Sequence, residues 1–212
     1  MPIRVETYTA DGIATGMLAG TDRLRGVLES GRELLIERAT WYGLDGSGPR
    51  PAAELRVAPD DVYVIVGDQA EDGPVHAQWH GITLDLGPYH LTGEMPTLPG
   101  FDPGRALARP TGEFVLLRDV RIELLGRDDA GTAENAQALV NRYVVDRVEA
   151  DMMLGFFFPG AEMIVTGAPE IGSAGVAAGV SRADEPAATA TEVSSAGAST
   201  VVVGSGPPID GA

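Results

Sequence analysis

Apolar and polar residues alternate in two short stretches of the chain, VETYT at residues 5–9 and ITLDL at residues 82–86. A period of two predicts strands that bury one face. The turn-forming sequences TADG and LGPY end these stretches, so each is predicted to open a β-hairpin. Longer apolar runs at 33–44 and 113–125 predict long strands, and the turn APDD divides residues 53–67 into two more strands.

A short helix is predicted between the hairpin and the long strand in both parts of the chain. TDRLRGVLES at residues 21–30 has apolar residues at helical spacing and Thr21 or Asp22 as its candidate N-cap. DPGRALAR at residues 102–109 offers Asp102 as the cap and Pro103 at the first helical position, where the missing N–H costs no hydrogen bond. Different residues thus predict the same element twice.

The two parts of the chain also resemble each other in sequence. Residues 5–18 align with 82–95 at an offset of 77, which places Gly16 on Gly93. Residues 33–40 align with 113–120 at an offset of 80, with Arg38 on Arg118, and residues 62–67 align with 150–155 at an offset of 88. The common order of these matches predicts an internal repeat in which Gly16, Gly93, Arg38 and Arg118 have structural roles.

The sequence therefore predicts a mainly β protein built of two tandem small modules. Each module is expected to be a five-stranded barrel-like or strongly bent sheet with one short helix, the first over residues 1–72 and the second over residues 73–165. The remaining residues, 166–212, are mainly Ala, Gly, Ser, Thr, Val and Pro with acidic residues among them. Such a segment buries too little surface to offset its ordering entropy, so a disordered tail is predicted.

Charge narrows the classes of partner. The 212-residue chain carries a net charge of -16, which repels phosphate backbones and anionic membrane surfaces and disfavours nucleic-acid binding. There is no cysteine, which excludes disulfides, thiolate metal sites and cysteine nucleophiles. The N-terminal MPIRVETYTADG has no apolar core of an export signal, and no run of about 18 apolar residues predicts a membrane helix. A cytoplasmic location is expected.

The run VETYTADGIATGML, followed by LLIERA and then LRVAPDDVYVIV, resembles the layout of the Sm-like proteins, which are SH3-like small β-barrels. The resemblance covers residues 3–67 and, more loosely, residues 80–155. It implies two hairpin strands joined by a D-G turn, a glycine, a curved third strand and a two-strand signature. The layout of this chain also resembles that of bacterial tandem modules of unknown function.

The RNA pocket implied by the resemblance lacks its key residues. Where the family places an Asp followed by an Asn, Asp22 is followed by Arg23, Leu24 and Arg25, and Asp102 is followed by Pro103 and Gly104. The Arg-Gly step of the last signature is replaced by Arg56 and Val57. The resemblance therefore implies assembly through edge strands, with the RNA site absent.

Other candidate sites have weak patterns. His76 and His80 stand four apart, but they flank the module boundary, and His90 is expected in a turn, so no metal is predicted. The acidic pairs Asp60–Asp61, Asp128–Asp129 and Glu71–Asp72 lack the spacing of a calcium loop and are interpreted as solvated turn carboxylates. Gly-rich GLDGSGPRP has no following lysine and is interpreted as a surface loop. No cofactor is predicted.

The most unusual segment is MMLGFFFP at residues 152–159, which contains Met152, Met153, Phe156, Phe157 and Phe158. One interpretation is a last strand whose aromatic end packs between the modules and stops at Pro159. The other is an exposed apolar patch for self-association or a protein partner. Val201–Val203 is a candidate docking strand in the tail.

These observations favour a non-enzymatic binding or assembly protein that acts through strand edges and an apolar patch near Phe156–Phe158. The alternative is a cleft between the modules that binds a small molecule or hydrolyses it with distant carboxylates such as Glu33 and Glu113. RNA binding is a third possibility, which the net charge opposes.

Overall fold

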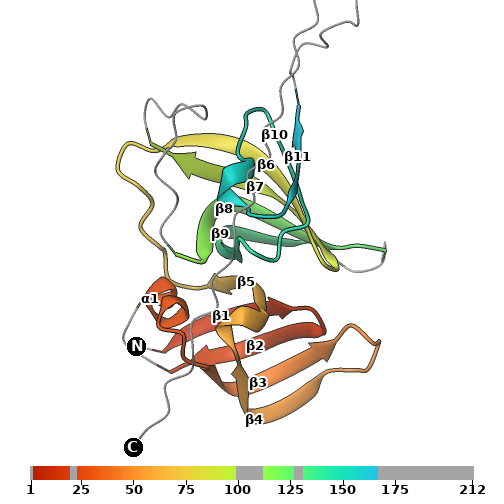
Figure 1. The fold of residues 1–212 in the computed structure, drawn as a ribbon. Coiled ribbons are helices and arrows are strands. Elements are labelled where there is room, and N and C mark those ends of the chain that lie inside the picture. Colours follow the sequence, from red (N-terminus) through yellow and green to blue (C-terminus); the bar gives the residue numbers. More distant parts are fainter. Residues whose placement is uncertain (1, 20–22, 99–111, 127–130, 167–212) are drawn as a thin grey trace, which may run out of the picture. The chain divides into compact units, whose positions relative to one another are not determined.

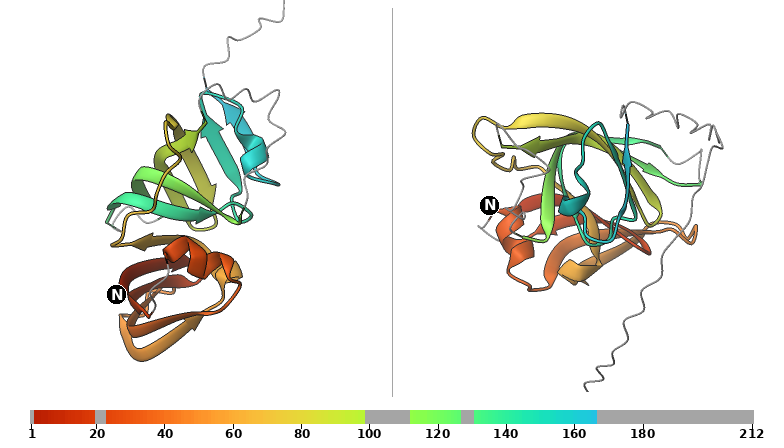
Figure 2. Two further views of the ribbon diagram at one scale, coloured as in Figure 1. Left: turned by 90° about the vertical axis from the view of Figure 1, so that its left-hand side faces the viewer. Right: turned by 45° about the horizontal axis from the view of Figure 1, so that its top comes forward.

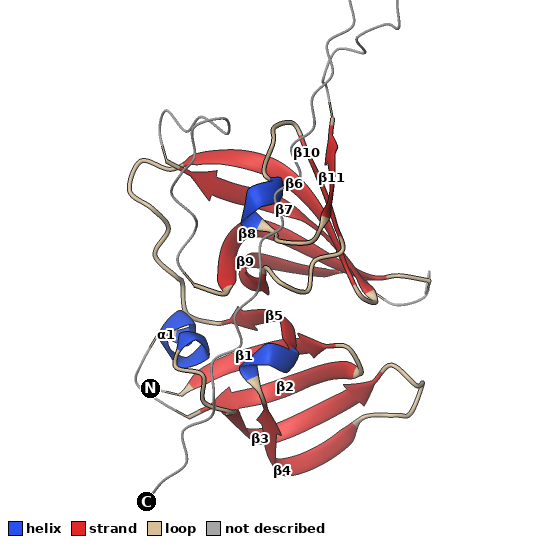
Figure 3. Cartoon of the chain, viewed as in Figure 1, coloured by secondary structure: helices blue, strands red, loops and turns tan. Residues whose placement is uncertain are grey.

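The described residues form eleven strands, one α-helix and two short 3-10 helices (Figures 1 and 3). The computed structural model describes residues 2–19, 23–98, 112–126 and 131–166. These residues belong to one compact unit that covers residues 1–170. The predicted helix at 102–109, Asp128–Asp129, and the tail with Val201–Val203 lie outside the described residues.

The mainly β prediction is confirmed, and most strands lie where the sequence patterns place them. In chain order the elements are β1 (Ile3–Thr9), β2 (Gly12–Leu18), α1 (Leu24–Glu29), β3 (Leu34–Gly43), β4 (Arg50–Val57), the 3-10 helix η1 (Pro59–Asp61), β5 (Val62–Gly67), β6 (Gln78–Leu86), β7 (Tyr89–Thr97), β8 (Phe114–Leu124), β9 (Ala133–Asn141), β10 (Arg147–Ala150), the 3-10 helix η2 (Gly155–Phe157) and β11 (Glu162–Val165).

All eleven described strands join in one strongly bent sheet, in the order β11-β10-β6-β7-β8-β9-β5-β1-β2-β3-β4 (Figure 2). The first five strands follow the order β5-β1-β2-β3-β4, and the next five follow β10-β6-β7-β8-β9, which is the same order one set later. We call these sets the N-terminal half and the C-terminal half. One continuous sheet therefore runs through the regions in which separate sheets were expected.

The hairpin registers of the two halves coincide with the sequence alignment. Val5 lies opposite Gly16 in the β1–β2 pair, and Ile82 lies opposite Gly93 in the β6–β7 pair. Both pairs keep the offset of 77. Apolar residues at alternate positions bury the same face in each hairpin, because successive side chains of a strand point to opposite faces.

A β-bulge lies at each of these glycines. The register shifts between Thr15 and Met17 in the β2–β3 pair and between Thr92 and Glu94 in the β7–β8 pair. A Cβ on Gly16 would lie 2.5 Å from Ile36 Cγ2 and 2.8 Å from the Glu37 oxygen, so the close approach at this bulge requires glycine.

The long strands need a small correction to the alignment. Arg38 and Asp119 both have positive φ, 50° and 51°, and they occupy the same place beside the two bulges. Arg38 therefore corresponds to Asp119, one residue beyond the predicted Arg118. Short matches such as ELLIERAT and EFVLLRDV fix the register only to within one residue. The alignment of Arg38 with Arg118 and the alignment of Arg38 with Asp119 both keep several apolar positions matched.

The fifth strand of the C-terminal half was placed wrongly by the sequence. Ile65 of β5 lies opposite Thr7, and Val148 of β10 lies opposite Leu84, so β10 at Arg147–Ala150 corresponds to β5. The predicted segment, residues 150–155, overlaps β10 at Ala150 alone. β10 has the short sequence RVEA. The MMLG that follows is more apolar and matches VYVIVG better, so the sequence alignment placed the strand there.

The predicted first helix is confirmed, and its N-cap is Arg23, with no side-chain cap; the predicted caps Thr21 and Asp22 lie outside the described residues. The carboxylate of Glu71 instead accepts the Arg25 N–H at 3.1 Å, and Asp72 forms an ion pair with Arg23. Both carboxylates come from the connection between β5 and β6. A cap supplied from so far along the chain leaves no local sequence pattern.

Each half has its own buried cluster, and the clusters exchange residues where β5 meets β9. Phe114, Leu116 and Leu139 of the C-terminal half join the cluster of the N-terminal half. Tyr8 and Val64 of the N-terminal half join the other cluster. This exchange follows from the alternation of side chains across a shared sheet, because paired strands present residues to both sides.

Candidate assembly edges

Two strands end the sheet of the described residues, β4 at one side and β11 at the other (Figure 3). An edge strand presents backbone N–H and C=O groups that a further strand can pair with. The two edges differ in length, in exposure and in what each would offer an incoming strand.

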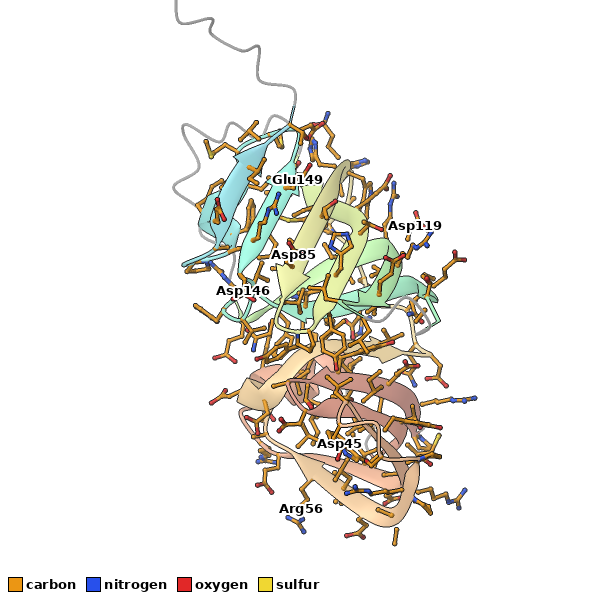
Figure 4. All side chains as sticks on the ribbon, turned by 90° about the vertical axis from the view of Figure 1, so that its right-hand side faces the viewer. Asp45, Arg56, Asp85, Asp119, Asp146 and Glu149 are labelled. Atoms are coloured by element: carbon orange, nitrogen blue, oxygen red, sulfur yellow. The ribbon has the colours of Figure 1, made fainter. Side chains whose placement is uncertain are left out.

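The β4 edge is long and largely exposed. Residues 50–54 and Arg56 are exposed, whereas Leu55 is half-buried and Val57 is buried on the core face. Figure 4 shows the Arg56 side chain extending away from the sheet. Arg56 pairs with Glu33 at 3.5 Å, and both side chains are more than half exposed, which makes this ion pair weak.

Pro51 fixes which β4 backbone groups face outward. Pro51 lies opposite Thr40 on β3 but has no N–H, so this pair is of the non-hydrogen-bonded kind. Because hydrogen-bonded and non-hydrogen-bonded pairs alternate along an antiparallel ladder, Ala52 forms a hydrogen-bonded pair with Ala39, and the N–H of Ala53 turns outward. The positive φ of Arg38 shifts this alternation, so that farther along β4 Leu55 and Val57 face β3, whereas Glu54 and Arg56 face outward. The N–H groups of Ala53 and Arg56 therefore point away from β3.

The β11 edge is short, and β11 itself covers β10. β11 pairs in parallel with β10, with Arg147 opposite Glu162 and Val148 opposite Met163. The Glu162 N–H donates to the Asp146 oxygen at 2.8 Å, and the Thr166 N–H donates to the Ala150 oxygen at 2.7 Å. β10 is thus held on both sides, by β6 and by β11.

The junction between the halves shows how this chain extends its own sheet. β5 pairs with β9 in antiparallel fashion, with Val64 opposite Val140 and Ile65 opposite Leu139. All four residues are buried. In the shared register, β9 corresponds to β4 and β5 corresponds to β10. The chain thus contains one pairing between a strand of the β4 type and a strand of the β5 type.

Side chains strengthen the same junction. The Gln137 side chain accepts the Glu71 N–H at 2.8 Å and donates to the Glu71 oxygen at 3.2 Å. Tyr89 donates its hydroxyl to the Thr9 oxygen at 2.8 Å. The rings of Tyr8 and Tyr89 meet edge to face at 5.3 Å. Glu71 therefore serves in backbone hydrogen bonding at the junction, beyond the solvated turn role predicted for it.

Burial raises the pKa of both phenols, and for Tyr8 the hydrogen bond from its hydroxyl to Glu6 raises it further. The folded protein thus retains protons that the unfolded chain releases above about pH 10. Stability contributed by these groups is fully present below that pH and is lost above it, by up to about 1.4 kcal/mol per pH unit for each tyrosine. Urea unfolding between about pH 9 and 11, on either side of that ordinary tyrosine pKa, measures this slope.

In these unfolding experiments Tyr8→Phe and Tyr89→Phe should each reduce the slope, because each removes one ionisable phenol. Tyr143→Phe, at a position whose side chain is 58% exposed, is the matched control and should leave most of the slope. An equal slope in the wild type and in both buried-site variants would contradict the prediction.

The aromatic segment divides between core and surface. Phe158 is fully buried in the C-terminal cluster, and Phe157 and Met152 pack against that cluster. Phe156 is half-buried and its ring lies 4.3 Å from that of Phe157, while Met153 is 53% exposed. The segment forms η2 between β10 and β11, so the interpretation as a last strand between the modules is wrong, and Phe158 is excluded from any surface patch.

The guanidinium of Arg118 contacts side chains of two neighbouring strands. Its guanidinium lies 4.0 Å from the centre of the Trp79 ring and donates to Glu94 from Nε at 2.6 Å. These contacts join β6, β7 and β8 on one face of the sheet. Gly16 and Gly93 lie at the two bulges, and the structural roles predicted for these glycines, Arg38 and Arg118 stay predictions.

The histidines do not come together. His76 is exposed with a positive φ of 61°, and His80 lies in β6, where its Nε2 is 2.9 Å from Thr97 Oγ1. His90 lies in β7, 2.6 Å from Asp85, and not in the turn predicted for it. Among the described residues, no three potential metal-ligating side chains form a group.

The loop GLDGSGPRP joins β3 to β4 as a surface turn. Ser47 donates its backbone N–H to Asp45 Oδ1 at 2.8 Å, and hydrogen bonds from Ser47 hold the pKa of Asp45 below its ordinary value. Asp60 and Asp61 are exposed in η1 (residues 59–61), as predicted for turn carboxylates.

Two hollows on the described surface lie away from Glu33 and Glu113, the carboxylates of the alternative hypothesis. One hollow of about 400 Å³ lies over β6, β7 and β10 and includes Thr83, Thr92 and Glu149. Another of about 350 Å³ lies over β8 and β9. Glu33 and Glu113 are exposed and line neither hollow.

None of the helices in the described residues combines the length and the apolar character needed to span a bilayer. Comparison with known proteins gives no match: no model of a protein family fits this chain, and neither the curated proteins nor the solved structures contain a significant similarity.

Proposed function

We propose that this chain is a non-enzymatic binding and assembly protein of the cytoplasm, and that its working surface is the open β4 edge. The observation that carries the proposal is the β5–β9 junction, where a strand of the β4 type extends a sheet by antiparallel pairing. β4 has the same place in its half, and its outer side is unpaired within the described part of the chain.

The equal strand order and register of the two halves support a tandem repeat as part of this proposal. They are also consistent with an Sm-like organisation of each half. The charge of -16 favours protein partners over RNA in this reading. Charged residues along β4 restrict pairing to complementary strands, as edges of soluble sheets commonly do.

Ala53→Pro in the full chain tests the use of this edge. Proline removes one outward N–H, and each lost hydrogen bond is worth about 0.5–1.5 kcal/mol. In an assembly that uses both copies of the edge, association should weaken at least about tenfold. Sedimentation velocity over a range of concentrations measures the mass, against 22.1 kDa for one chain.

Ala53→Ser retains the N–H and is the matched control, which should associate as the wild type does. A wild-type chain that remains monomeric at the highest concentration would refute the proposal. So would an Ala53→Pro chain that associates as strongly as the wild type.

A further inference from the structure

We infer that β4 pairs with β4 of a second copy, antiparallel and centred on Leu55, to form a two-fold symmetric dimer. This inference rests on the proposed use of the β4 edge and names its partner and register. Charge, backbone orientation and the apolar strip along β4 carry it.

Charges on the solvent-facing side of β4 select the centre. A two-fold axis at Leu55 places Glu54 of each copy opposite Arg56 of the other, which gives two favourable cross-strand pairs. Within its own chain, Glu54 lies opposite Glu37, a like charge. The second copy thus supplies the opposite charge that the neighbouring strand does not place there.

Other registers bring like charges together or lose donors. An axis at Ala53 places Arg50 opposite Arg56, and an axis at Glu54 or Arg56 places that residue opposite itself. An axis at Ala52 pairs Arg50 with Glu54 but requires the missing N–H of Pro51 on both chains.

Backbone orientation agrees with the same centre. With the axis at Leu55, Ala53 lies opposite Val57 and Leu55 lies opposite Leu55 of the other copy. Glu54 and Arg56, which lie opposite each other in this register, turn their N–H and C=O groups outward, so the paired edges form about four hydrogen bonds.

The core-facing side adds apolar contact. Leu55 is half-buried opposite Ile36, and Val57 is already buried beside Leu34 of β3. In the dimer these residues form one apolar strip continuous with the buried face of the N-terminal half. At the β5–β9 junction of the same sheet, Val64 and Val140 pair across two strands and are both buried, so apolar side chains are already paired in this way within the chain.

Charge reversal tests the register in the full chain. Glu54→Arg and Arg56→Glu each create two like-charge pairs in their own dimer, so each variant should associate about tenfold more weakly than the wild type. Mixed in equal amounts, the two variants can form a heterodimer in which both cross-strand pairs again join an arginine to a glutamate, so association should return. Sedimentation velocity of the two variants, alone and mixed, is the measurement.

Recovery in the mixture also shows that each variant is folded. Unchanged association of the single variants, or a mixture no stronger than its components, would overturn the register. If Ala53→Pro abolishes association while the charge variants do not, the edge is used in another way, and the proposed function stands without this inference. If Ala53→Pro has no effect, both fail.

Discussion

Phe158→Ala is expected to lower the free energy of unfolding by about 3–5 kcal/mol. Phe158 is fully buried in the cluster of the C-terminal half, so removal of its ring leaves a cavity that the surrounding strands fill only in part. Urea unfolding, followed by circular dichroism, gives the change from the shift in midpoint at constant slope.

Met153→Ala is the matched control from the same segment. Its side chain is 53% exposed, so truncation should change the free energy of unfolding by less than about 0.5 kcal/mol. A loss below about 1 kcal/mol in Phe158→Ala would contradict the assignment of this phenylalanine to the core.

Ile164→Pro is expected to convert the chain into larger assemblies whose mass grows with concentration. N–H donors alternate along β11, with Glu162 and Thr166 donating to β10, so Ile164 is the donor between them. Proline at this position removes that donor and weakens the covering of β10. The freed positions, Arg147 and Val148, correspond to Val64 and Ile65, which pair with β9 in the junction.

The exposed β10 edge then competes with β4 of a second copy for the free side of β4, and its head-to-tail contact forms rings or filaments in place of the two-fold dimer. Met163→Pro is the control, since the Met163 N–H points away from β10, and this variant should keep the wild-type mass. Adding Ala53→Pro to Ile164→Pro should suppress growth. A wild-type mass in Ile164→Pro, with hydrogen exchange showing that Val148 has lost protection, would refute the role of β11 as a cover.

Local pattern was sufficient for most of the fold. Alternation in VETYT and ITLDL, followed by turn residues, located both hairpins, and the apolar runs located β3 and β8. The resemblance between Gly16 and Gly93 also reflects a shared physical requirement, since both lie at a bulge where strands approach closely. These features depend on neighbours a few residues apart, so the sequence contains their signal.

Features that depend on distant partners were missed or misplaced. β10 is four residues long, and its pairing with β6 and β11 outweighs its weak pattern. The hydrophobicity of the aromatic run predicted a strand. In the structure the run contains the 3-10 helix η2, and the side chain of Phe158 is buried in a core formed by other strands. Glu71 resembled a turn residue, and only folding brings it to the Arg25 N–H.

By itself the sequence determined the strand-rich composition, the two hairpins, the glycines at the bulges and the acidic charge. The tertiary structure alone decided that one sheet runs through both halves, that β11 covers β10, and that β4 is left open among the described strands. The physical reason is that strand propensity is local, whereas the identity of an edge depends on which backbone hydrogen bonds remain after all other strands have paired.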